Sequence, residues 1–116
     1  MATYKRSVYS VVLNKPDDYV HGFVQDYMAK KGFTYKTVKG QQVWKKGIGM
    51  LAAPRLFRYQ YINGVLTVEA WLHAVFLPGI CLSEMDLEGV YGFAIKEAFK
   101  RDIQQLFYLL QQPMYM

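Results

Sequence analysis

The stretch LFRYQYINGVLTVEAWLHAVF, residues 56–76, decides the fold of this chain. Two runs rich in β-branched and aromatic residues, 56–62 and 65–76, flank the dipeptide Asn63-Gly64. Asn-Gly between such runs is the strongest short-range signal for a β-hairpin, because both residues accept a positive φ. We therefore predict two antiparallel strands joined by a two-residue turn, which also sets their register.

This register divides the side chains of the hairpin between two faces. It places Arg58 opposite Glu69, and one face then carries Phe57, Tyr59, Tyr61, Leu66, Val68, Ala70 and Leu72. We predict that this apolar face is the core face. The other face carries Arg58, Gln60, Thr67, Glu69, Trp71 and His73, and we expect it to lie outside the core. Aromatic and arginine side chains anchor interfaces, so the candidate interaction surface is Trp71, His73, Glu69 and Arg58.

The segments before this hairpin predict a strand, a helix and a second hairpin. Residues 3–13 are rich in β-branched and aromatic residues and read as a strand. Pro16, Asp17 and Asp18 suit the first turn of a helix, and apolar residues recur every three or four positions from Tyr19 to Met28. Residues 33–38 and 41–46 then read as strands joined at Lys39-Gly40.

The segments after the central hairpin predict a loop and a long helix. The break at Leu77-Pro78-Gly79 ends the strand, and residues 83–89 read as an acidic loop. A helix of about 90–112 follows, with apolar residues at helical spacing. The element order is therefore β-α-β-β-β-β-α, which predicts an α+β fold with an antiparallel sheet of about five strands. We expect the C-terminal helix to pack across one face, in a helix-grip-like arrangement by analogy of element order.

Size and composition indicate one globular domain covering residues 1–116. Hydrophobic residues make up 53% of the chain and charged residues 20%, a balance typical of a packed core. Cys81 is the only cysteine, which excludes a disulfide within the chain and favours a reducing compartment. We find neither a signal peptide nor an apolar run of about 18 residues, so we expect a cytoplasmic location.

No motif for catalysis, a cofactor or a metal is present in the sequence. The two histidines, His21 and His73, have no cluster of further ligand residues at metal-binding spacing. The glycines at 47 and 49 lack the third glycine and the following helix that a phosphate-binding loop needs. We therefore expect a protein that is not an enzyme and that uses no cofactor.

The charge of the chain is concentrated in its first half. Residues 1–58 contain eleven Lys and Arg against three Asp, whereas residues 59–116 contain three against six acids, and the whole chain carries +5. A candidate basic patch consists of Lys30, Lys31, Lys36, Lys39, Lys45 and Lys46. Because Tyr35 and Trp44 are interleaved with these lysines, binding of nucleic acid through the patch is one alternative function.

Residues 42–47, 68–72 and 77–96 resemble a family of small, uncharacterised bacterial domains, and the likeness extends over most of the chain. The family carries no named activity, so the resemblance transfers no functional residue. From the residues themselves we expect a protein-interaction or self-associating module, and a homodimer is one form of it. A second alternative is a small apolar ligand held between the sheet and the C-terminal helix, in a cavity lined by Tyr59, Tyr61, Leu72, Ile95 and Phe99.

Overall fold

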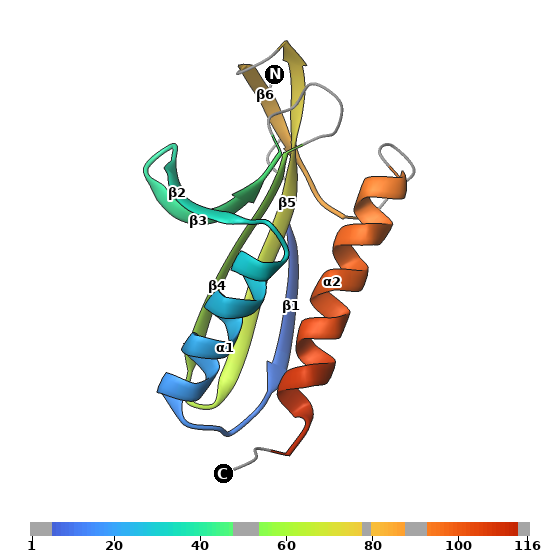
Figure 1. The fold of residues 1–116 in the computed structure, drawn as a ribbon. Helices are drawn as coiled ribbons and strands as arrows, with labels where there is room; N and C mark the ends of the chain where they lie inside the picture. The colour runs from blue at the N-terminus through green and yellow to red at the C-terminus, as the bar shows by residue number, and fades with distance from the viewer. Residues whose placement is uncertain (1–5, 48–53, 78–79, 88–92, 114–116) are drawn as a thin grey trace.

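The computed structural model describes residues 6–47, 54–77, 80–87 and 93–113. These residues form an antiparallel sheet with two helices, as predicted from the order of elements. The elements are β1 (Ser7–Val12), α1 (Asp17–Lys30), β2 (Thr34–Val38), β3 (Gln41–Lys46), β4 (Arg55–Ile62), β5 (Val65–Leu77), β6 (Ile80–Met85) and α2 (Phe93–Gln111). Figure 1 shows α1 and α2 lying along the β1, β5 and β4 part of the sheet.

The sheet has six strands in the described residues, one more than the sequence predicts. The strand order is β1-β5-β4-β3-β2, and β6 pairs with β5 outside this path. β5 is long enough to pair with β1 along its first part and with β6 from Leu72 onward. The additional strand includes Ser83 to Met85, for which the sequence predicts an acidic loop. That part of the loop prediction is wrong, because the exposed edge of β5 supplies hydrogen-bonding partners that local sequence does not reveal.

The register of the central hairpin is the one predicted from Asn63-Gly64. Ile62 lies opposite Val65, and Arg58 lies opposite Glu69. Asn63 has φ 53° and Gly64 has φ 78°, the two positive values that a turn of this kind requires. The Gly64 carbonyl also accepts hydrogen bonds from the backbone N–H groups of Leu13 and Asn14, which connects the turn to the segment between β1 and α1.

The main core lies between the predicted core face of the hairpin and the two helices. Its buried side chains from the sheet include Phe57, Leu66, Val68, Ala70 and Leu72. The buried side chains from the helices are Val20, Val24, Tyr27, Met28, Phe99, Ile103, Leu106 and Leu110. Both helices therefore cover the same face of the sheet, and the core prediction is confirmed for these positions.

Polar contacts connect α1 and the segment just before it with α2. The Lys15 ammonium donates hydrogen bonds to the carbonyls of Leu110 and Gln112, where a cation complements the negative end of the helix. The Tyr27 hydroxyl donates to the Asp102 carbonyl at 2.7 Å. These bonds fix the two helices relative to each other over the core face.

The opposite face of the sheet is partly covered, which corrects one expectation. Trp71 is 1% exposed and His73 is 4% exposed, so neither belongs to an open surface. Trp71 packs with Val43 and Leu56 in a second apolar cluster. The alternation of side chains along β5 assigns Trp71 to this face correctly, but it cannot show that other segments lie on top of it.

Candidate functional site

A partial separation of two neighbouring strands creates the candidate site. β3 pairs with β4 only at Trp44 to Lys46, opposite Arg55 to Phe57. Beyond that point, no strand in the described residues pairs with β4 on the side away from β5. Figure 1 shows the β2–β3 hairpin bending away from the β4–β5 ribbon near the end of α1. The space beside β4 therefore opens between α1 and the hairpin.

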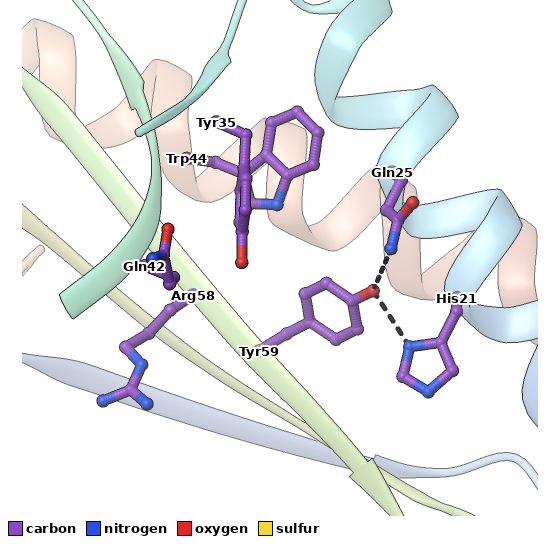
Figure 2. A pocket seen from close by; sticks show the side chains of 7 residues that line it. All are labelled: His21, Gln25, Tyr35, Gln42, Trp44, Arg58 and Tyr59. Carbon is purple, nitrogen blue, oxygen red and sulfur yellow. Dashed lines mark hydrogen bonds between the residues drawn. The ribbon is translucent and has the colours of Figure 1, made fainter. Parts of the chain in front are cut away.

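A pocket of about 450 Å³ occupies this space. Its lining combines three aromatic rings with four polar side chains: His21, Gln25, Tyr35, Gln42, Trp44, Arg58 and Tyr59. Figure 2 shows Tyr59 between the helix side, with His21 and Gln25, and the hairpin side, with Tyr35 and Trp44. The seven residues come from α1, β2, β3 and β4, so the tertiary fold assembles the pocket.

Tyr59 is held in place by two side chains of α1. Its hydroxyl lies 3.0 Å from Nδ1 of His21 and accepts a hydrogen bond from the Gln25 amide at 3.3 Å. Because the Gln25 amide is a donor, the Tyr59 hydroxyl accepts from it and keeps its own proton for a further hydrogen bond. His21 and Gln25 are one helical turn apart and so reach the same hydroxyl.

Burial makes Tyr59 a hydrogen-bonding group rather than a base. Desolvation raises the pKa of the Tyr59 phenol above its usual 10.0; the Gln25 hydrogen bond opposes that increase, and the nearby Tyr35 adds to it. The phenol therefore stays protonated at neutral pH. The side chains that line the pocket include no carboxylate and no thiol. The combination of three aromatic rings with a few polar groups suits the binding and orientation of a ligand.

Tyr35 and Trp44 form the wall of the pocket on the hairpin side. They lie opposite each other in the β2–β3 register, and their ring centroids are 5.1 Å apart at an interplanar angle of 52°. Tyr35 is 56% exposed, whereas Trp44 packs partly buried against the main core. The pair thus presents an aromatic surface in which the Trp44 ring is partly buried and the Tyr35 ring is accessible.

The predicted interaction surface is only partly accessible. Arg58 and Glu69 keep partly exposed side chains and form an ion pair at 3.4 Å, and Arg6 approaches Glu69 at 3.6 Å. The expectation that Trp71 and His73 are exposed beside them is wrong, because both side chains are buried. Of the four candidate residues, Arg58 alone lines the pocket described above.

The predicted ligand cavity under the C-terminal helix contributes one residue to this pocket. Tyr59 lines it, but Tyr61, Leu72 and Phe99 are buried in the main core. Ile95 packs partly buried against the same core. This pocket therefore lies beside α1 rather than beneath α2, and those four residues do not line it.

The six lysines of the predicted basic patch do not form one cluster around Tyr35 and Trp44. Lys36 and Lys45 lie opposite Val43 and Leu56, so they are on the other face of the hairpin. Lys30 pairs with Asp26 at 2.9 Å, and Lys31 pairs with Asp102 at 3.5 Å. Lys46 lies over the ring of Phe33, and Lys39 is in the β2–β3 turn with φ 50°.

The sequence pattern does not predict His21, Gln25 and Gln42 as pocket residues. His21 and Gln25 follow Val20 and Val24 by one position, a spacing that marks the flank of an amphipathic helix. Gln42 shares a strand face with Trp44. Those local signals were available, but the strand separation that brings the residues together has no local signature.

Two further classes of site are not found in the described residues. No group of three or more His, Cys, Asp or Glu side chains there is arranged to hold a metal ion. Among the helices described, none has the length and apolar character needed to cross a membrane.

Comparison of the chain with protein-family models, with curated proteins and with solved structures finds no match. The resemblance to small bacterial domains therefore stays a prediction.

Proposed function

We propose that this chain is a non-enzymatic protein-interaction module that binds an extended acidic segment of a partner protein along the open edge of β4. The partner segment adds as a strand where β3 has bent away, and one of its aromatic side chains enters the pocket beside Tyr59. The observation that carries the proposal is the end of β3–β4 pairing at Trp44 and Phe57, while β4 continues to Ile62.

The hydrogen-bonding groups of β4 support strand addition. In a hairpin with a two-residue turn, the residues flanking the turn exchange hydrogen bonds, and every second pair along the ladder repeats this pattern. Ile62, Gln60 and Arg58 therefore direct their backbone groups toward β5. Tyr59 and Tyr61 direct theirs toward the open side, which is the pattern that an added strand needs.

The pocket supports an aromatic side chain as the anchor. A side chain opposite Tyr59 on an added strand lies on the same sheet face as Tyr59. There it meets the rings of Tyr35 and Trp44, with the amides of Gln25 and Gln42 nearby. Aromatic contacts of this kind contribute about 0.5–1.5 kcal/mol beyond the burial of area.

The charges around the site are compatible with an acidic segment. Arg58 is the only charged side chain in the pocket lining; it forms an ion pair with Glu69 at 3.4 Å, and its side chain remains 43% exposed. The first half of the chain, which supplies every lining residue except Tyr59, carries the large excess of Lys and Arg. An acidic partner segment gains from this field during encounter, and a basic one is repelled.

The test uses capped synthetic peptides and NMR of the isotope-labelled chain. The probe is TETFTET, and its comparison peptides replace Phe by Ala, both Glu by Lys, or methylate alternate backbone nitrogens. We expect TETFTET to shift the amide signals of Tyr59 and Tyr61. Each comparison peptide should bind at least about tenfold more weakly, which is about 1.4 kcal/mol.

A pair of exposed tyrosines provides matched variants. Tyr35→Ala removes a pocket wall, whereas Tyr108→Ala removes an exposed ring on α2; the two residues are 56% and 63% exposed. Binding should weaken only in Tyr35→Ala. Equal affinity for the N-methylated peptide would overturn strand addition. Tighter binding of a single-stranded oligonucleotide than of TETFTET would favour the nucleic-acid alternative instead.

A further inference from the structure

We propose that two copies of this chain associate through their β1 strands, which pair antiparallel about Ser10 and join the two sheets into one. β1 is the end strand of the sheet, and its described partner, β5, occupies one side of it. This surface is separate from the β4 edge and the pocket, so the inference is independent of the proposed peptide binding.

The backbone of β1 has the hydrogen-bonding pattern that this pairing requires. Along β5, backbone hydrogen-bonding groups alternate in direction from Asn63-Gly64 onward. The N–H and C=O groups of Leu66, Val68 and Ala70 point away from β4, toward Val11, Tyr9 and Ser7 of β1. The backbone N–H and C=O groups of Val8, Ser10 and Val12 consequently point to the open side of β1. A second β1 centred on Ser10 would form about six hydrogen bonds with these three residues.

The side chains of β1 are self-complementary in this register. Val8 and Val12 are 58% and 63% exposed, and they are spaced equally on either side of Ser10. Antiparallel pairing about Ser10 places Val8 opposite the partner's Val12, and Val12 opposite the partner's Val8. Two exposed β-branched residues are thereby covered on each copy, in the cross-strand pairs that stabilise sheets.

A groove lies on the helix side of the same edge. It has a volume of about 200 Å³ and is lined by Tyr9, Lys100, Ile103, Gln104 and Phe107. In the proposed register Tyr9 lies opposite the partner's Val11, on the face that α2 covers. Val11 packs partly buried against the core of its own chain, so in the dimer it lies beside the groove and adds apolar contact to the backbone pairing.

The charge of this edge permits two basic copies to meet. The strand SVYSVV contains no charged residue, although the chain carries +5. Lys100 in the groove forms an ion pair with Glu97 at 3.3 Å, which offsets its charge. End strands of monomers usually carry lysines, prolines or bulges that prevent pairing. β1 has none of these protections, and a second copy is the occupant that its symmetry and neutrality fit.

Sedimentation of two matched variants tests the dimer. Ser10→Lys places two cations next to each other across the pairing axis, whereas Gln60→Lys adds the same charge in the same cross-strand row, but on β4. We expect the parent chain and Gln60→Lys to dimerise and Ser10→Lys to stay monomeric. A dimer that persists in Ser10→Lys, or a parent chain that is monomeric at millimolar concentration, would overturn the proposal.

Cross-linking gives a positive readout that does not depend on disrupting the strand. Hydrogen-bonded antiparallel pairs have Cα atoms about 5.5 Å apart, within the range that a disulfide spans. In a Cys81→Ser background, Ser10→Cys should oxidise to a covalent dimer and Thr67→Cys should not. High salt should leave dimerisation nearly unchanged; loss of the dimer at high salt would indicate association of the oppositely charged halves instead.

Discussion

The guanidinium carbon of Arg6 lies 3.7 Å from the ring centroid of Trp71. Arg6 also donates a hydrogen bond to the Gln41 side chain at 2.9 Å and approaches Glu69 at 3.6 Å. It therefore connects β3 with β5 on the face away from the helices. This contact explains why Trp71 is buried on a face that its position in the sequence assigns to the outside.

Removal of the Arg6 side chain should expose Trp71. We expect Arg6→Ala to lower the free energy of unfolding by about 1–2 kcal/mol, because it removes a partly buried cation–π contact and the packing of its stem. Tryptophan emission should shift to longer wavelength in the folded state. Lys30→Ala removes an exposed pair with Asp26 and should cost less than about 0.5 kcal/mol. An equal effect of the two substitutions would contradict the role of Arg6.

The two turn glycines should differ in their tolerance of alanine. Gly64 has φ 78°, and an added Cβ would contact Asn14, including its Cα at 3.2 Å. Gly40 has φ 80°, and no atom lies within 4 Å of an added Cβ. Gly40→Ala should therefore cost about 1–2 kcal/mol from backbone strain alone. Gly64→Ala should cost measurably more in urea unfolding, and equal costs would show that Asn14 moves aside freely.

The predicted core face can be tested with two aliphatic residues of the same hairpin. Leu66 is fully buried, and Ile62 is more than half exposed. Leu66→Ala should reduce the free energy of unfolding by about 2–5 kcal/mol, because it leaves a cavity in the main core. Ile62→Ala should change it by about 0.5 kcal/mol or less. The reverse order would mean that the hairpin register is shifted by one residue.

Alkaline pH should destabilise the contact between the helices. Burial, and secondarily the charge of Asp102, raises the pKa of the Tyr27 phenol from 10.0 to about 12. The folded state therefore favours the protonated phenol, and its stabilisation is complete below pH 10 and is lost as the pH rises toward 12. Absorbance of the phenolate should show a late-titrating step near pH 12 to which Tyr27 contributes. Tyr27→Phe should reduce that step and flatten the decline in stability over this range.

The local features of the fold were predictable because local chemistry determines them. Asn63-Gly64 accepts positive φ at both positions, so the turn, the register and the Arg58–Glu69 pair followed from two residues. The aspartates at the start of α1 and the apolar spacing from Val20 to Met28 likewise indicated the first helix. In these elements neighbouring residues and tertiary contacts favour the same structure.

The pocket was not predictable because it depends on where the pairing of β3 with β4 stops and on how α1 and the β2–β3 hairpin lie beside β4. Nothing near Trp44 or Phe57 signals that β3 leaves β4 there, and β6 adds to an edge of β5 that sequence alone treats as free. The burial of Trp71 depends on Arg6 and Val43, which are far away in sequence. Alternation along a strand assigns a face, but coverage of that face is a property of the assembled chain.

The pairing of Ser7 with Ala70 has a consequence for synthesis on the ribosome. β1 is translated before β5, and it cannot pair with that strand until the whole segment between them has been translated. At roughly 5–20 residues per second, that interval lasts about 3–13 seconds. Throughout this interval an uncharged, valine-rich segment lacks the strand with which it pairs, and unpaired segments of this kind are prone to aggregate.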